Sequence, residues 1–164
     1  MSSSREPTAT IAVRVDVAPA VAFDLFTREI DRWWRRGPKF RHSGREVGVL
    51  RLEPRLDGVV SETWTDAGGA HRIEFGRVTA WEPPHRVAFT WRNATFAPFE
   101  QTDVEVTFAV MGSSTLVTVR HRGWESLRPD HPARHGSDDA ALQREVGLWW
   151  GELLTALREF AVAT

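Results

Sequence analysis

The sequence predicts an α+β fold in which a curved antiparallel sheet of about six to seven strands wraps around a long C-terminal helix. Between residues 47 and 122, stretches that alternate apolar and polar residues are separated by short turn sequences, as in neighbouring antiparallel strands. Residues 137–164 instead carry apolar residues at helical spacing, over a stripe wider than a surface helix needs. Because a twisted sheet of this size curls, its inner face must be covered, and this helix is the only predicted element large enough to cover it.

The N-terminal segment predicts one strand followed by two short helices. Residues 8–17 alternate in the manner of a half-buried strand. Pro19 suits the first turn of a helix, which we expect to break near Thr27 and to resume over residues 28–35. Gly37-Pro38 then ends the helical segment.

About six strands are predicted in the middle of the chain, joined by turns such as Asp57-Gly58 and Gly68-Gly69. Gly76 is typical of a bulge or bend within its strand. In a later strand the alternation from Val104 to Val110 turns every second residue inward. The predicted strand ranges are 47–53, 59–65, 71–81, 86–92, 103–110 and 115–122.

The C-terminal helix has N-cap and first-turn signals at Ser137, Asp138 and Asp139. Trp149 and Trp150 point about 100° apart on a helix, so they cannot both face the centre of the space between sheet and helix. We expect Trp150 to face that centre and Trp149 to lie nearer the helix–sheet seam. Of two apolar rows, one is expected to face the sheet and the other the N-terminal helices: Leu142, Val146, Trp149, Leu153, Ala156 and Phe160, and Trp150, Leu154, Leu157 and Ala161.

Composition bounds the function. The 164 residues suit one domain, which we place at 8–164 after a poorly ordered tail at 1–7. A net charge of −1 creates no general attraction to nucleic acid or to anionic lipid. The absence of cysteine excludes disulfides, thiolate metal sites and a cysteine nucleophile. With neither a secretory signal nor an apolar run of ~20 residues, we expect a cytoplasmic protein without membrane insertion. No cofactor is predicted.

Four stretches, in order along the chain, resemble the motifs of a known family. Leu52–Gly58 resembles its EPR-x-G-G hairpin, and Gly76–Trp91 its G-x-V-x-x-x-x-P-P-x-R-L-x-F-x-W strand pair. Thr115–Trp124 resembles T-x-V-x-L-x-H-x-G-W, and Trp150–Leu154 resembles the G-W-x-x-x-L start of the closing helix. The sequence is therefore similar, over residues 8–163, to the START-like (SRPBCC, birch-pollen-allergen-like helix-grip) superfamily, and within it to homologues of the heat-shock-protein-90 ATPase activator.

This resemblance implies a helix-grip fold with a hydrophobic cavity between the sheet and the long helix. The family name comes from a eukaryotic co-chaperone in which this domain is joined to a separate chaperone-binding domain, so we infer no chaperone binding from the name. Trp149 stands where the family more often has glycine, and residues 126–137 form an extended connection. Both departures lie near the expected mouth of the cavity, so the family's ligand preference is not carried over.

Aromatic residues are the main candidates for function. Eight tryptophans and nine phenylalanines accompany no tyrosine, and any single ring is more simply explained as core packing. As a set they predict a ring-lined cavity, since so many indole rings exceed what a close-packed two-layer core needs. The predicted ligand-binding residues are Trp33, Trp34, Phe40, Trp64, Phe75, Phe89, Trp91, His121, Trp124, Trp150 and Leu154.

His121 shares strand parity with Val117 and Val119, so it is predicted to point inward. Its role is either a hydrogen-bonded core histidine or a polar group of the cavity, including a general base tuned by burial. Among other strand charges, which comprise Arg51, Glu62, Arg77 and Arg120, an inward arginine would indicate a ligand with an anionic head group.

Two further clusters of charged and histidine residues do not require a functional explanation. His131 and His135, with Asp138, have helical metal-ligand spacing, but Pro132 argues against a helix and no third ligand is fixed, so no metal site is predicted. A basic group interleaved with rings spans residues 28–41, where nucleic acid is conceivable. Acidic residues dilute it, and we interpret it as a solvated face without nucleic-acid binding.

Three functions remain open. The favoured one is a non-enzymatic binder of a small hydrophobic molecule, such as a lipid, an isoprenoid or a polyketide-like compound, in a stress-related role. The second is a cyclase- or hydrolase-like enzyme that uses His121 with Glu62 or Arg120; no catalytic residue is assigned. The third is a protein-interaction or co-chaperone module that uses an exposed Trp33–Trp34 patch. We expect a monomer or a homodimer.

Overall fold

The computed structural model describes residues 8–92, 96, 100–124, 127 and 138–163. The predicted tail at 1–7, the metal hypothesis on His131 and His135, and most of the 126–137 connection lie outside the described residues. The elements, in chain order, are β1 (Thr8–Val15), α1 (Pro19–Thr27), α2 (Ile30–Trp33), β2 (Val49–Leu52), β3 (Val59–Asp66), β4 (Gly69–Glu82), β5 (Arg86–Trp91), β6 (Thr102–Met111), β7 (Ser114–Arg122) and α3 (Asp139–Ala163).

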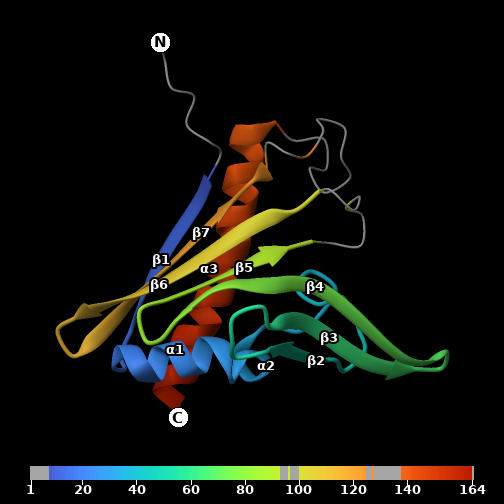
Figure 1. Cartoon of the computed structure of the whole chain (residues 1–164), viewed down its shortest axis with the longest axis horizontal. Coiled ribbons are helices and arrows are strands. Elements are labelled where there is room, and N and C mark those ends of the chain that lie inside the picture. Colours follow the sequence, from blue (N-terminus) through green and yellow to red (C-terminus); the bar gives the residue numbers. More distant parts are fainter. Residues whose placement is uncertain (1–7, 93–95, 97–99, 125–126, 128–137, 164) are drawn as a thin grey trace.

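The seven strands form one antiparallel sheet with the order β1-β7-β6-β5-β4-β3-β2. Strands β2 to β7 follow one another as a meander, and β1 extends it at the edge by pairing with β7, with Val13 opposite Val117. Figure 1 shows the twisted sheet crossing in front of α3, with α1 and α2 at the end where the chain's C-terminus lies. The α+β class and the predicted order of elements are confirmed.

The turns and the bend of the sheet follow from local backbone demands. Asp57 has φ 62° and Gly69 has φ 106°, both in the left-handed region that their turns require. The β3–β4 register shifts beside Gly76, because Val60 pairs with Gly76 and Ser61 with Glu74, which leaves one bulged residue. A Cβ on Gly76 would overlap the carbonyl oxygen of Thr90 on β5, so this close approach of two strands needs glycine.

The helix α3 begins as predicted. The Asp138 carboxylate accepts a hydrogen bond of 2.8 Å from the backbone N–H of Ala141, which makes Asp138 the N-cap. The row Trp150, Leu154, Leu157 and Ala161 is fully buried in the main core. The other row reaches the N-terminal segment, where the Arg32 guanidinium lies 5.2 Å from the centre of the Phe160 ring. The two rows do not divide cleanly between the sheet and the N-terminal helices, because Trp150 also contacts Trp34 and Trp149 also contacts Trp91 on β5.

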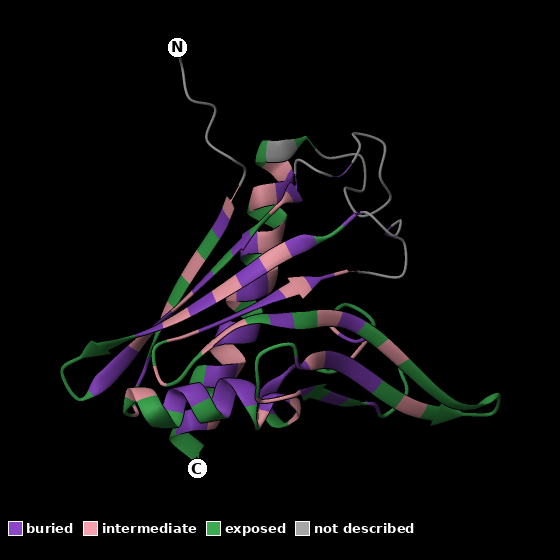
Figure 2. Cartoon of the chain, in the orientation of Figure 1, coloured by how far each residue is buried: buried purple, intermediate pink, exposed green. Residues whose placement is uncertain are grey.

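The core occupies the space between the sheet, α3 and the two short helices (Figure 2). A smaller second cluster comprises Phe96, Trp124, Leu127 and Leu142. The ends of the β3–β4 and β6–β7 hairpins project beyond this cover and are exposed (Figure 2). Val110, expected to face inward, is 73% exposed because it lies at such an end. None of the described helices is long and apolar enough to cross a membrane.

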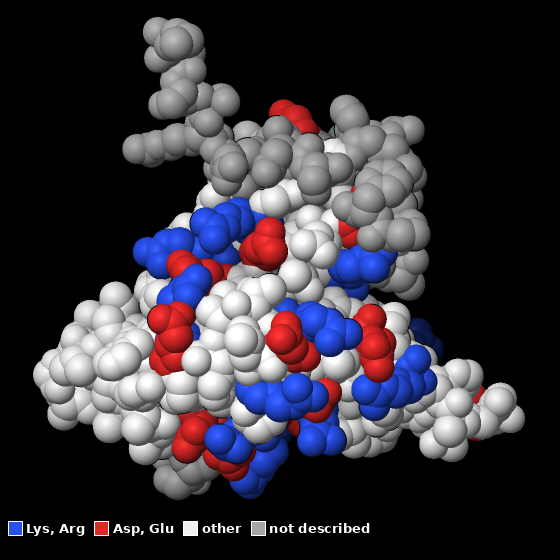
Figure 3. Space-filling view, viewed as in Figure 1, with Lys and Arg blue, Asp and Glu red and all other residues white. Residues whose placement is uncertain are grey.

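The basic residues near the N-terminal helices do not form a positive face. Arg32 pairs with Glu29 at 2.7 Å, Lys39 pairs with Glu152 at 2.9 Å, and Arg28 lies 3.5 Å from Asp24. On the face seen in Figure 3, Lys and Arg likewise lie among Asp and Glu. Arg41 departs from the expected solvated face, because it is 4% exposed and serves the site described below.

Candidate functional site

Indole rings gather where α2, β5 and α3 meet. The centre of the Trp34 ring lies 5.5 Å from Trp33, 6.1 Å from Trp91 and 5.5 Å from Trp150. All four tryptophans are buried, and Phe75, Phe89 and Leu154 belong to the same core cluster. The structure thus brings most of the predicted set together, and Trp150 faces its centre as predicted. That these residues bind a ligand stays a prediction.

The exposure of the rings increases toward one side. Phe40 and Trp149 are half-buried and pack on each other at 5.9 Å. The Trp149 indole N–H donates to the carbonyl of Lys39 at 2.8 Å, so this ring bridges α3 to the segment after α2. Its centre also lies 5.7 Å from that of Trp91 on β5, on the sheet side of the helix. With His42, which is also half-buried, Phe40 and Trp149 form what we call the mouth of the site.

The proposed Trp33–Trp34 contact patch is wrong. Trp33 is 4% exposed and Trp34 is 3% exposed. Their indole N–H groups donate to the carbonyls of Leu25 at 2.7 Å and Phe40 at 2.9 Å. Burial on α2 with satisfied polar groups makes them part of the interior wall and not a surface for a partner.

His121 lies inside as predicted, and its hydrogen bonds fix its state. Its Nδ1 accepts the Trp150 indole N–H at 3.1 Å, so the proton of the neutral ring sits on Nε2 and is donated to the Thr102 hydroxyl at 2.7 Å. The Thr102 hydroxyl in turn donates a hydrogen bond to the carbonyl of Trp91 at 3.2 Å. Burial lowers the pKa of His121 to about 3. His121 is therefore a neutral, fully bonded connector between sheet and helix.

A second histidine, His42, was missed by the sequence reasoning. Its ring lies 4.7 Å from the centre of the Phe75 ring and 6.4 Å from that of Trp91, at the mouth of the site. Neither ring nitrogen makes a hydrogen bond to any residue that the structure describes. Burial lowers the pKa of His42, and the nearby Glu62 carboxylate only partly opposes this effect. No periodicity signals His42, since it lies in an irregular loop.

Glu62 is wholly buried on β3 and explains the position of that loop. Its carboxylate accepts the backbone N–H groups of His42 at 2.8 Å and Ser43 at 3.2 Å. A Cβ on Gly48 would collide with this carboxylate, so glycine there lets the loop close over it. Glu62 thus points inward, as considered, but as an anchor for the chain.

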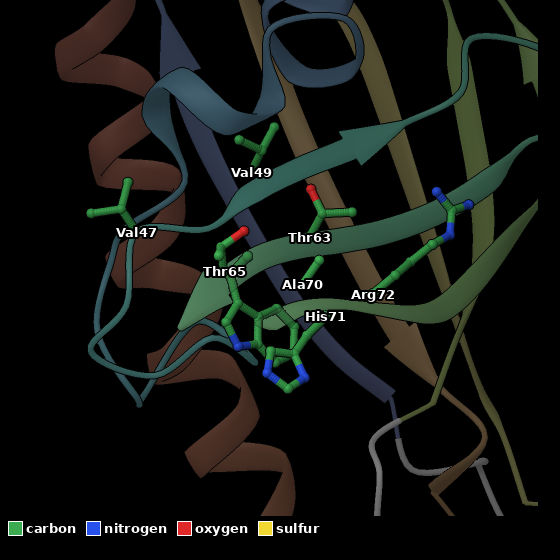
Figure 4. Close-up of a pocket in the computed structure, with 8 residues that line it drawn as sticks. Val47, Val49, Thr63, Thr65, Ala70, His71 and Arg72 are labelled. Atoms are coloured by element: carbon green, nitrogen blue, oxygen red, sulfur yellow. The ribbon is translucent and has the colours of Figure 1, made fainter. Parts of the chain in front are cut away.

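Trp64 and Trp124 lie apart from the ring cluster. Trp64 has the parity of Glu62, but it sits where the β3–β4 hairpin has passed beyond α3, and it stacks on His71 at 5.3 Å. These two residues line a shallow groove of about 480 Å³ whose other walls include Val47 and Val49 (Figure 4). The expectation that Trp64 faces the space between sheet and helix is wrong. Trp124 belongs to the small second cluster and reaches the site through His121 at 4.6 Å.

Among the described residues, no group of three His, Cys, Asp or Glu side chains could hold a metal ion. The site therefore offers aromatic ring faces and one histidine, His42, whose ring nitrogens form no hydrogen bond with a described residue. Such an arrangement can stack planar or branched apolar molecules and orient them by one polar contact.

The meander extended by β1, the long helix packed on it and the aromatic interior define a START-like helix-grip domain. The sequence matches the family described as "Activator of Hsp90 ATPase homolog 1-like protein" over residues 16–159. The chain belongs to this family, which confirms the resemblance found in the motifs.

Solved structures show the same fold at low sequence identity. A protein from Mesorhizobium loti is 16% identical with a TM-score of 0.63, covering 96% of this chain and 98% of its own. A protein from Nitrosomonas europaea is also 16% identical with a TM-score of 0.63, covering 99% of both chains. The Aha1 dimer from Colwellia psychrerythraea is 13% identical with a TM-score of 0.60, covering 93% of both. Among curated proteins, no match was found.

Proposed function

We propose that this protein binds a small hydrophobic molecule, such as a lipid, an isoprenoid or a polyketide-like compound, between the sheet and α3. The observation that carries the proposal is the cluster of contacting indoles whose rings become more exposed toward Phe40, His42 and Trp149. Phe40 and Trp149 are the rings that must move to admit a ligand, because they are the least buried members of the cluster. Binding would gain from removing apolar ligand surface from water against these walls.

Native mass spectrometry of the freshly purified protein tests this proposal first, since a retained molecule reports its own mass. Farnesol, oleate and 1,8-dihydroxyanthraquinone then serve as isoprenoid, lipid and polyketide-like probes. A bound probe should quench tryptophan fluorescence and raise the melting temperature, by an amount that grows with the logarithm of the ratio of probe concentration to Kd. If neither signal appears with any probe and no mass is retained, the proposal fails.

Two half-buried tryptophans provide a matched pair for the location. Trp149→Ala removes a ring of the mouth, and Trp64→Ala removes a ring of the outer hairpin. We expect Trp149→Ala to change probe affinity at least severalfold and Trp64→Ala to leave it unchanged. The reverse result would place binding in the groove lined by Val47, Val49 and Trp64.

The structure gives less support to the enzyme hypothesis in its original form. His121 uses both ring nitrogens in hydrogen bonds and has a pKa near 3, so it is a poor general base near neutral pH. Arg120 is exposed on the opposite face of β7 and does not share its site. The choice between monomer and homodimer stays a prediction, for which light scattering after size exclusion is the test.

A further inference from the structure

The loop of residues 41–48 is held at two points beside the mouth. The guanidinium of Arg41 donates to the Asp31 carboxylate at 2.6 Å, and also to the carbonyls of Trp34 at 2.8 Å and Gly48 at 3.3 Å. The Glu62 carboxylate holds the backbone N–H groups of the next two residues. Since the backbone of His42 lies between these two anchors, the point from which its side chain projects is fixed before any ligand arrives.

The imidazole ring of His42 forms no hydrogen bond with a residue that the structure describes. His121 makes two side-chain hydrogen bonds, whereas the imidazole of His42 packs at a tilt against the rings of Phe75 and Trp91. A half-buried imidazole with both nitrogens available, placed on the edge of an aromatic cluster, is suited to one directional polar contact. Its lowered pKa keeps it neutral near pH 7, so one nitrogen is an acceptor.

The surrounding charges select the kind of group that can meet this nitrogen. The nearest carboxylate is Glu62, which forms no salt bridge with a described residue and would repel an anionic head group. The Arg41 guanidinium is buried and already donates to Asp31 and to backbone carbonyls. The Lys39 ammonium lies 5.5 Å from the centre of the Phe40 ring, but it is paired with the Glu152 carboxylate at 2.9 Å. The strand arginines Arg51, Arg77 and Arg120 are all exposed.

An ammonium group is disfavoured for a different reason. Glu62 is 0% exposed and both of its oxygen atoms accept backbone N–H groups under the 41–48 loop. A cation at the mouth would be attracted by ring faces, but it would lose water without reaching that carboxylate, and such desolvation is costly. An uncharged hydrogen-bond donor has neither penalty.

Resting on the proposed function, we infer that His42 is the polar contact of this site and that its preferred ligand is an uncharged ring compound whose hydroxyl group donates to the His42 imidazole. Fatty acids and phosphorylated lipids are then poor ligands, although their apolar parts would fit the same walls.

Isothermal titration calorimetry at pH 7.5 with a matched probe series tests the inference. The probes are 2-naphthol, 2-methoxynaphthalene, which lacks the donor, 2-naphthoate and 2-naphthylmethylammonium. We expect 2-naphthol to bind about five- to tenfold more tightly than 2-methoxynaphthalene, the size of one hydrogen bond, and both charged probes to bind more weakly than 2-naphthol.

Three variants assign this preference to His42. His42→Phe keeps the ring contacts and the backbone N–H that Glu62 holds, so it should fold and bind both neutral probes with equal affinity. His42→Gln restores a hydrogen-bonding side chain and should recover part of the difference. His71→Phe, on the outer hairpin, should behave as the unsubstituted protein.

The outcomes separate the two proposals. If the neutral probes bind and the preference for 2-naphthol is absent, or persists in His42→Phe, the assignment of His42 is wrong while the binding function stands. Tightest binding of 2-naphthoate or of the ammonium probe would likewise overturn the assignment. If no probe binds and no molecule is retained on purification, the binding function fails and this inference fails with it.

Discussion

Two histidines that flank Trp91 have opposite roles, and their hydrogen bonds make the difference. His121 is enclosed by the Trp150 indole and the Thr102 hydroxyl, which leaves it no free position. His42 contacts the same ring cluster from a loop, and its ring nitrogens form no hydrogen bond with a described residue, so they can bind a ligand. The burial that lowers the pKa of both is shared, so burial alone does not distinguish a structural histidine from a binding one.

A pH dependence of stability follows from His121. Its pKa is about 3 in the folded state and 6.5 as the ordinary value, so the unfolded chain binds a proton first as pH falls. The stabilisation is complete above pH 6.5 and declines below it. Between pH 7 and 4.5, this group alone should lower the free energy of unfolding by roughly 2–3 kcal/mol.

Urea denaturation of the wild type and of His121→Gln at these two pH values measures this effect. The substitution removes the titrating group, so the free energy of unfolding of the variant should depend clearly less on pH. A small dependence should remain because the pKa of His42 is also lowered. Equal slopes in the two proteins would show that His121 does not carry the dependence.

At the scale of elements, the sheet bends where β4 is bulged and where its backbone approaches β5. Gly76 permits that approach, and Arg92 on the far side donates its backbone N–H to the Phe75 carbonyl at 2.7 Å. Phe75 is thereby directed into the ring cluster beside His42. A local backbone requirement thus places one wall of the candidate site.

Two glycine-to-alanine substitutions distinguish a glycine required by the close approach of two strands from a glycine that only lowers helix propensity. Gly76→Ala should destabilise the protein by roughly 1–3 kcal/mol, because the new methyl group would overlap the Thr90 carbonyl. Gly151→Ala on α3 meets no atom within 4 Å and should stabilise it by up to about 1 kcal/mol. Thermal and urea unfolding provide the measurement, and a shift of the same sign in both variants would contradict this account.

At the scale of the whole molecule, the first and last strands pair and the last helix closes the core. Trp150 connects these parts: its ring contacts Trp34 on the N-terminal side at 5.5 Å, and its N–H bonds His121 on β7. Each contact spans a large sequence separation, so the aromatic site forms only when the complete domain has folded.

Truncating Trp150 should therefore cost global stability. Trp150 is 0% exposed, and Trp150→Ala should lower the free energy of unfolding by about 3–5 kcal/mol. Leu148→Ala, two residues away and 72% exposed, should change it by less than about 0.5 kcal/mol. If Trp150→Ala costs no more than Leu148→Ala, the ring is not part of the packed core, and probe affinity becomes the measure of its role.

Much of the architecture could be read from the sequence because its signals are local. Glycine turns, alternation and the cap at Asp138 each act over a few residues, and each was found where expected. Parity also placed His121 inward correctly. The predictions for Trp64 and Val110 are wrong because parity gives only the direction of a side chain. Burial also requires a packing partner on that face of the sheet, and both hairpins extend beyond the helices that cover the sheet.

The sequence by itself determined the order of strands and helices, the inward faces and the aromatic character of the interior, since periodicity and turn chemistry specify these. Only the tertiary structure decided which histidine is bonded and which is available. That difference depends on hydrogen bonds between residues as distant as His121 and Trp150, and on the two anchors, Arg41 and Glu62, that hold His42 in an irregular loop. No repeating pattern encodes such contacts, because they exist only once the sheet has curled around its helix.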